Sequence, residues 1–239
     1  MIKIGVIGGT AIHGFFKGPI LEHDTLYGKV KYMLTTTEPR IVYIPRHGFK
    51  QHIPSSQVNY RAIISTLLYL GVRYVVSTTL ASRLNKNYEI GDIVVPHDVI
   101  DFTKSRQTSL DPTMKAYIDT HRLFSENLRE TIIREARQQG FRVHPSGVVV
   151  VIEGPRGETP AEARMYRLLG GDLISMSLVP EVFMAKEAGI EYASIALIID
   201  HAADEAPKKD YEEIKTLIQE YRQRIGELIL KIASSIISS

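Results

Sequence analysis

The run GVVVVIEGPRGETPAE, residues 147–162, carries the strongest structural signal in this sequence. Val148–Ile152 is a short, β-branched apolar segment, which predicts a buried strand, and Gly154 and Pro155 end it. The turn carries three charged side chains, Glu153, Arg156 and Glu158. Ligands of open α/β sheets bind at strand ends, so this turn is a candidate site. The alternative is a surface turn that holds an ordinary ion pair.

Composition excludes several protein classes. With 239 residues the chain is long enough to bury a core. The net charge of +2, with both signs interspersed, provides no basic stripe for nucleic acid. There is no cysteine, and hence no disulfide or thiolate chemistry. The start MIKIGVIGG is typical of a first strand rather than a signal peptide, and no apolar run reaches the roughly 18 residues of a membrane span. We expect a cytoplasmic protein that binds neither nucleic acid nor membrane.

Predicted strands and helices alternate along the chain. Strands are expected at 2–7, 30–35, 41–44, 74–77, 93–95, 148–152, 173–176 and 191–199, and helices at 59–70, 121–139, 180–188 and 211–237. Thr103–Thr120 is polar and weakly patterned, which predicts a loop. The sequence shows neither repeat nor linker, so the pattern favours one three-layer α/β domain over residues 1–239.

Several predicted strands run into small or polar residues that suit an anion. Gly8-Gly9-Thr10 offers backbone N–H groups and a hydroxyl. Arg46 and His47 follow the strand at 41–44, and a guanidinium fork suits phosphate. Ser77-Thr78-Thr79 adds hydroxyls at the expected end of another strand. Each feature alone could be a tight turn, a surface pair or a helix cap, but together they predict one oxyanion pocket.

Other phosphate and metal motifs are absent from the sequence. GVIGGTAIHG lacks the G-x-G-x-x-G spacing and the later acidic residue of a dinucleotide site, and no P-loop motif occurs. The eight histidines are scattered without the spacing of metal ligands. We therefore predict neither a nicotinamide cofactor nor a metal.

The motifs occur in a characteristic order: GVIGGT (5–10), PRHG (45–48), VNYRA (58–62), STT (77–79), GDIVVP (91–96), IEGPR (152–156), MSLVPEVFMAKEAG (176–189) and YASIALIID (192–200). Over nearly the whole chain this order resembles the methylthioadenosine phosphorylase branch of the purine nucleoside phosphorylases. The resemblance implies a mixed central β-sheet flanked by helices, and a homotrimer or a dimer of trimers. It also implies inorganic phosphate as co-substrate, with no metal or organic cofactor.

The same resemblance assigns roles to individual residues. It implies a phosphate site made of Thr10, Arg46, His47 and Thr79. Met176 is expected under the ribose, and Leu80 is a further expected substrate contact. Asp200 is expected to face N7 of the purine as a neutral acid, with a pKa raised by burial. His47 and Asp200 are thus the expected catalytic residues.

The chain also departs from the pattern of this branch. Gly157 and Glu158 replace a Phe-Ser pair whose phenylalanine packs on the purine, and Glu158 stands where 6-oxopurine phosphorylases place a base-reading glutamate. Alternatively, Glu158 only caps the helix near Pro160 or pairs with Arg156. Ala202 replaces a second aspartate, Gln51 and His52 replace a single histidine, and Ser82-Arg83 replaces a Gly-Ser pair.

Three functions remain open on this basis. The first is phosphorolysis of a 5′-methylthioadenosine-type nucleoside. The second is phosphorolysis of a 6-oxopurine nucleoside such as inosine, guanosine or methylthioinosine. The third is a catalytically weak nucleoside- or anion-binding homologue. We further predict that Arg46→Ala weakens phosphate binding while leaving the fold intact.

Overall fold

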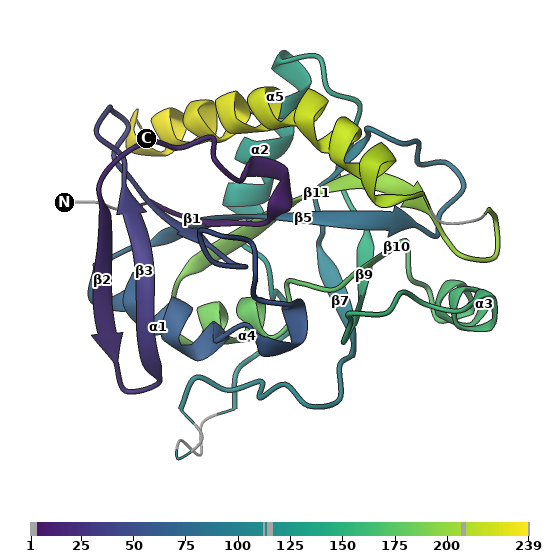
Figure 1. The fold of residues 1–239 in the computed structure, drawn as a ribbon, viewed down its shortest axis with the longest axis horizontal. Coiled ribbons are helices and arrows are strands. Elements are labelled where there is room, and N and C mark those ends of the chain that lie inside the picture. Colours follow the sequence, from purple (N-terminus) through teal and green to yellow (C-terminus); the bar gives the residue numbers. More distant parts are fainter. Residues whose placement is uncertain (1–3, 112, 114–116, 207–208, 239) are drawn as a thin grey trace.

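A mixed β-sheet forms the centre of the computed structural model, which describes residues 4–111, 113, 117–206 and 209–238 (Figure 1). Within that part of the chain the sheet has eleven strands. They are β1 Ile4–Gly8, β2 Ile20–Thr25, β3 Gly28–Leu34, β4 Ile41–Pro45, β5 Tyr74–Arg83, β6 Ile93–Val94, β7 Asp98–Phe102, β8 Val143–His144, β9 Val148–Ile152, β10 Leu173–Ser175 and β11 Glu191–His201. β1 pairs in parallel with β4 and β5, whereas β3–β4 and β5–β10 are antiparallel. The predicted mixed sheet is confirmed.

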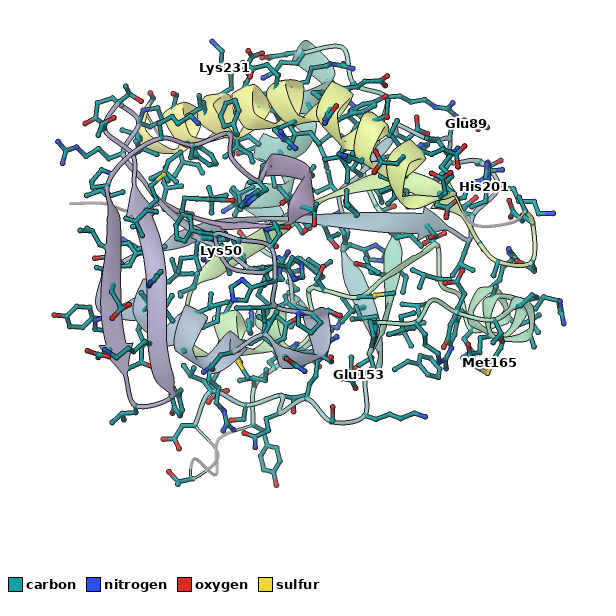
Figure 2. All side chains as sticks on the ribbon, in the orientation of Figure 1. Lys50, Glu89, Glu153, Met165, His201 and Lys231 are labelled. Atoms are coloured by element: carbon teal, nitrogen blue, oxygen red, sulfur yellow. The ribbon has the colours of Figure 1, made fainter. Side chains whose placement is uncertain are left out.

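Helices cover both faces of this sheet. They are α1 Tyr60–Tyr69, α2 Glu126–Gln138, α3 Pro160–Leu168, α4 Glu181–Glu187 and α5 Tyr211–Ser238, with short 3-10 turns at Thr10–Ile12 and Ser55–Gln57. Figure 1 shows α2 and α5 on one face, and α1 and α4 on the other. Lys231 points outward from α5, and Met165 lies on the outer side of α3 (Figure 2). The expected three layers are thus present. Among the described helices, none is long and apolar enough to cross a membrane.

Local sequence explains where the helices begin. The Asn59 side chain accepts from the Ala62 N–H at the start of α1, and Ser125 accepts from Leu128 N–H at the start of α2. Thr159 and Glu162 form a reciprocal capping box at α3. Because Ser125 is the cap, α2 begins five residues later than the predicted start at 121.

Strand prediction succeeded where the strand is apolar and buried. β1 and β4 are buried at every residue, as their continuous apolar runs indicate. β2 was not predicted because it is a largely exposed strand with a polar sequence, ILEHDT. β7 and β8 were missed as well. β5 was predicted to end at Ser77 but continues to Arg83. The Ser-Thr-Thr hydroxyls therefore lie within a strand, not after it.

Candidate active site

One cavity of about 690 Å³ opens beside β5, where β1, β4 and β10 end. Seven of the eight predicted site residues line it: Thr10, Arg46, His47, Thr79, Leu80, Glu158 and Met176. Asp200 is not one of its lining residues, but Ile199 before it lines the cavity, and so does Ser82, its partner in the β5–β11 register. The sheet therefore gathers side chains that lie far apart in the sequence.

Arg46 follows β4 and is fully buried at one end of this cavity. Its Nε and Nη2 donate to the two carboxylate oxygens of Glu181 at 2.8 and 2.9 Å. Nη2 also donates to Ser77 Oγ at 2.6 Å, and Nη1 donates to the Thr78 carbonyl oxygen at 2.8 Å. An arginine has five N–H donors. The described contacts use four and leave one on Nη1, the nitrogen that lies against Gly9.

The Arg46–Glu181 ion pair is closed to solvent, because both side chains have 0% exposure. Burial acts to lower the pKa of Arg46, but the Glu181 carboxylate outweighs it and raises that pKa. Burial likewise acts to raise the pKa of Glu181, but Arg46 and two hydroxyl donors hold it below its usual value. Both groups are therefore ionised, and the pair has no net charge.

His47 is oriented by one hydrogen bond to the backbone. Its Nδ1 lies 2.9 Å from the Ile53 carbonyl oxygen, so Nδ1 carries a proton and donates it. Burial first, and then the Arg46 charge, lower the pKa of His47. The ring is consequently neutral near pH 7, and within the described contacts its Nε2 remains available to a ligand in the cavity.

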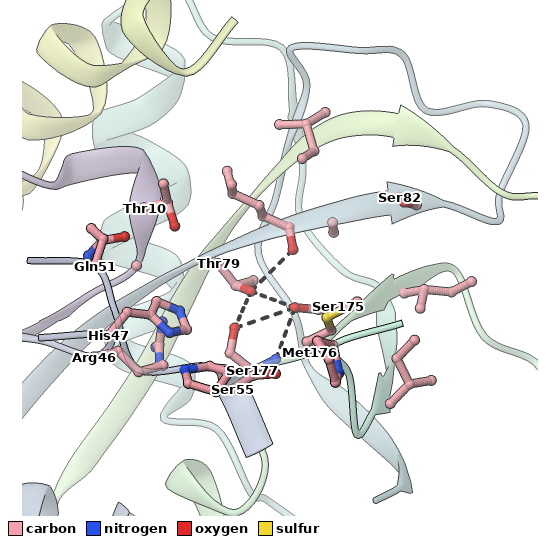
Figure 3. A pocket seen from close by; sticks show the side chains of 18 of the residues that line it. Thr10, Arg46, His47, Gln51, Ser55, Thr79, Ser82, Ser175, Met176 and Ser177 are labelled. Carbon is pink, nitrogen blue, oxygen red and sulfur yellow. Dashed lines mark hydrogen bonds between the residues drawn. The ribbon is translucent and has the colours of Figure 1, made fainter. Parts of the chain in front are cut away.

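Hydroxyl groups form the floor of the cavity (Figure 3). Thr79 Oγ1 lies 2.6 Å from both Ser175 Oγ and Ser177 Oγ, and all three side chains are buried. A hydroxyl can donate or accept, so the cluster can turn its protons toward an anion. Sequence reasoning identified Thr79 but missed Ser175 and Ser177. The sequence did contain a signal for them. Ser175 and Ser177 are two residues apart, on either side of Met176, and side chains at that spacing in a strand point to the same face.

The Gly8-Gly9-Thr10 turn offers fewer backbone N–H donors to the cavity than the sequence predicted. The N–H of Gly9 donates to Thr78 Oγ1 at 2.9 Å, so it does not face the cavity as a free donor. A Cβ at position 9 would lie 2.9 Å from the Thr78 carbonyl oxygen and 3.1 Å from Arg46 Nη1. Glycine is required here because β1 approaches β5 and Arg46 closely. The Thr10 side chain faces the cavity, as predicted (Figure 3).

Met176 and the Gly154 turn shape the opposite end of the cavity. Gly154 has a φ of +69°, and a Cβ there would lie 2.7 Å from both Met176 Sδ and Ser55 Oγ. Only glycine lets the turn after β9 pass against Met176 without displacing it. The turn and the methionine are therefore packed as one surface.

Glu158 lies at this end, with 8% exposure. Its Oε1 accepts from the N–H of Ala203, in the loop after β11, at 3.0 Å. The cap of α3 is Thr159, and Arg156 donates bidentately to Glu162 at 2.7 Å. Other residues thus take the two structural roles considered for Glu158.

Asp200 lies near the end of β11 and is buried, with 3% exposure. Its carboxylate accepts from the backbone N–H groups of His201 at 2.9 Å and Lys209 at 3.4 Å. The loop after β11 is further tied by Arg83, which donates to His201 Nδ1 at 2.9 Å, and by ion pairs from Arg83 and Arg167 to Glu205. Arg83, which departs from the family pattern, thus contacts the residue beside Ala202, another departure.

The three charged side chains of the turn after β9, Glu153, Arg156 and Glu158, separate in the structure. Only Glu158 lines the cavity. Glu153 accepts from the N–H groups of Lys104 and Ser105 and from Arg106 Nε, and so anchors the loop that begins at 103 (Figure 2). Arg106 is itself buried and donates to the carbonyl oxygens of Met176 and Val179.

Backbone strain is concentrated at the cavity. Gln51 and Leu178 are the non-glycine residues with positive φ in the described chain, at 51° and 86°. Gln51 lines the cavity and Leu178 follows Ser177, which also lines it. Strained residues of this kind cluster at functional sites. Among the described residues no group of three or more His, Asp or Glu side chains could hold a metal ion.

Comparison with known proteins agrees with this geometry. The family described as "Phosphorylase superfamily" matches residues 3–234. A probable S-methyl-5′-thioinosine phosphorylase from Methanopyrus kandleri is 38% identical, covering 96% of this chain and 91% of that protein. An S-methyl-5′-thioadenosine phosphorylase from Hyperthermus butylicus is also 38% identical, over 96% and 86%. The solved methylthioadenosine phosphorylase from Schistosoma mansoni, in complex with adenine, superposes with a TM-score of 0.94 at 27% identity, over 100% of this chain and 93% of the other.

Proposed function

The chain belongs to the phosphorylase superfamily, and we propose that it converts a 5′-methylthioadenosine-type nucleoside and inorganic phosphate to free base and methylthioribose 1-phosphate. One observation carries the proposal. A single cavity joins a donor-rich end, built by Arg46, His47 and buried hydroxyls, to an end that holds Met176 and Glu158. The names of the relatives supply the nucleoside class.

The reaction exchanges two bonds at one carbon. A phosphate oxygen forms a bond to C1′ while the bond from C1′ to N9 breaks, and its electron pair moves into the purine. The base then takes a proton at N7. Because no covalent enzyme intermediate is needed, the protein contributes by holding phosphate against the sugar and by stabilising the departing base.

The donor-rich end is the proposed phosphate site. The remaining Nη1–H of Arg46, Nε2 of His47 and the hydroxyls of Thr10, Thr79 and Ser177 surround one region of the cavity. The N–H and the three hydroxyls can donate to the oxygens of a tetrahedral anion, and the unprotonated Nε2 of His47 can accept from a protonated phosphate oxygen. Leu80 and Met176 are then the proposed sugar and base contacts.

Asp200 remains the proposed proton donor to N7. Its position is supported by its neighbours Ile199 and Ser82, which line the cavity. For this role its carboxyl group must turn from the N–H groups of His201 and Lys209 toward the base. Asp200→Asn should therefore lower kcat more than it raises either KM.

A second substrate class is favoured by Glu158. An ionised carboxylate accepts hydrogen bonds, so it suits N1–H of a 6-oxopurine and opposes the acceptor N1 of adenine. The thioinosine phosphorylase relative is named for a 6-oxopurine nucleoside. A buried pair of two acceptors, such as an ionised Glu158 facing N1 of adenine, weakens binding by about 1–3 kcal/mol. Glu158→Gln should therefore shift the ratio of kcat/KM for methylthioadenosine over methylthioinosine toward adenine by roughly tenfold or more.

One assay tests the proposal directly. The protein is incubated with phosphate and, in turn, with methylthioadenosine, adenosine, methylthioinosine, inosine and guanosine, and release of free base is followed. We expect phosphate-dependent release, fastest with a methylthio nucleoside. No release from any of the five would contradict the function and favour a nucleoside-binding homologue.

We also propose a homo-oligomer, a trimer or dimer of trimers, that acts in purine salvage in the cytoplasm. Exposed apolar side chains on and beside α3 support an assembly: Met165, Leu168 and Leu169. Within the loop at 103–120, residues 109–111 bond to Glu187 of the same chain, and 112 and 114–116 lie outside the described residues. Light scattering that shows only a 26.9 kDa species would refute an oligomer.

A further inference from the structure

Glu181 lies at the start of α4 and does not line the cavity, yet it contacts Arg46, which does. Its two oxygens accept from Arg46 Nε and Nη2, from Ser77 Oγ at 2.8 Å and from Tyr192 OH at 2.5 Å. All of these groups are buried. Such a fully bonded carboxylate holds its partners in one geometry.

We propose that Glu181, supported by Tyr192, is a positioning residue for phosphate: it fixes the Arg46 guanidinium so that one Nη1–H is presented to the anion. This inference rests on the proposed phosphorolysis. It adds that the affinity and selectivity for phosphate depend on two residues outside the cavity.

The geometry leaves Arg46 no other arrangement. The guanidinium donates from Nε and Nη2 to the Glu181 carboxylate, and from Nη1 to the carbonyl oxygen of Thr78. Ser77 closes the network, because its hydroxyl accepts from Nη2 and donates to Glu181. A rotated guanidinium would break several of these bonds together, so the direction of the last N–H is set by Glu181.

The charge of the pair has a second consequence. Because Glu181 neutralises Arg46, removal of the carboxylate alone would leave a buried cation beside the cavity. Attraction to any anion would then increase while the direction of the N–H is lost. A purely electrostatic role of Glu181 therefore predicts tighter phosphate binding in a neutral variant, whereas a positioning role predicts weaker binding.

The variants Glu181→Gln and Tyr192→Phe test this difference. Tyr192→Phe removes only the hydroxyl that donates to Glu181. Tyr88→Phe is the matched control, because Tyr88 is also buried and its hydroxyl donates to the Ser146 carbonyl oxygen, away from Glu181. Each variant is first compared with wild type by circular dichroism and thermal melting.

Binding of inorganic phosphate alone is then measured by calorimetry, and KM for phosphate and for nucleoside by steady-state kinetics. We expect the phosphate Kd to rise roughly tenfold or more in Glu181→Gln and a few-fold in Tyr192→Phe. The nucleoside KM should stay within about twofold, and Tyr88→Phe should match wild type. If Glu181→Gln does not fold, Tyr192→Phe decides the question.

Two results overturn the inference, and they are distinguishable. Phosphate that binds wild type, with equal or higher affinity in the folded variants, overturns the positioning role and leaves the proposed function standing. Absence of phosphate binding and phosphorolysis in wild type overturns the proposed function itself, and the positioning role with it.

Discussion

Arg46→Ala should destabilise the protein, and the loss should depend on pH. The substitution removes the guanidinium that donates twice to Glu181 and leaves a carboxylate with 0% exposure. Breaking a buried ion pair costs about 3–5 kcal/mol. Ser77 and Tyr192 still donate to Glu181, so we expect the lower end, about 3 kcal/mol. This expectation differs from the sequence-based prediction that Arg46→Ala leaves the fold intact, because that prediction did not include the buried partner Glu181.

The pH dependence follows from the sign of the Glu181 pKa shift. In the wild type this pKa is lowered, so the ionised form stabilises the fold, and that contribution is lost as pH falls through the lowered value. Without Arg46, burial dominates and raises the pKa. The ionised carboxylate then destabilises the fold at pH values above the raised pKa. That penalty diminishes as the pH falls toward the ordinary value of a glutamate.

Urea denaturation of wild type and Arg46→Ala at about pH 7.5 and about pH 5 measures this effect. The deficit in the free energy of unfolding should be smaller at the lower pH. Arg129→Ala is the control, because Arg129 is buried too, but its carboxylate partner Glu126 is 61% exposed. Its deficit should not shrink on acidification. An Arg46→Ala deficit that is absent at pH 7.5, or equal at both pH values, would refute the reasoning.

Three further predictions concern the cavity. Burial and, after it, the Arg46 charge lower the pKa of His47. At pH values below this pKa the ring gains a charge and a second N–H donor, so sulfate should inhibit more strongly as the pH falls from about 8 to 5.5. His47→Gln should abolish that trend. Gly154→Ala should raise the nucleoside KM and lower the melting temperature, because the new Cβ would meet Met176 and Ser55 at 2.7 Å. A Cβ at Gly157 meets nothing within 4 Å, so Gly157→Phe should fold normally and lower the KM of an adenine nucleoside a few-fold, through about 0.5–1.5 kcal/mol of aromatic contact.

The sequence predicted the mixed sheet and several of the residues that line the cavity, because both depend on local sequence patterns. Buried apolar runs predicted β1, β4, β9 and β11, and residues at the ends of β1 and β4 do line the cavity. β5 was predicted too short since its second half, Thr78–Arg83, carries small and hydroxyl side chains where it forms the cavity floor. In this part of β5 the residues that line the cavity interrupt the apolar pattern by which a buried strand is predicted.

The residues with which each charged side chain forms hydrogen bonds or ion pairs could not be predicted from the sequence in the same way. Arg46 and Glu181 are 135 residues apart, and Glu153 and Arg106 are 47 apart. Nothing local distinguishes a glutamate that binds a ligand from one that binds a buried arginine. The three charged residues of the turn after β9 show this. Glu153 anchors a loop, Arg156 bonds to Glu162, and of the three only Glu158 lines the cavity.

The neutral Arg46–Glu181 pair fits the electrostatics of the proposed reaction. Phosphate gives up negative charge as its oxygen bonds to C1′, so a site with a strong uncompensated cation would stabilise bound phosphate more than the transition state. Groups that bind both states equally do not accelerate the chemical step. The N–H of a neutralised arginine and the hydroxyls can orient phosphate through directed donors, and a neutral His47 can accept from a P–O–H group, while together they add little net charge. In the proposed mechanism the positioning of phosphate is therefore separate from the stabilisation of the charge that develops on the leaving base, for which Asp200 is the proposed proton donor.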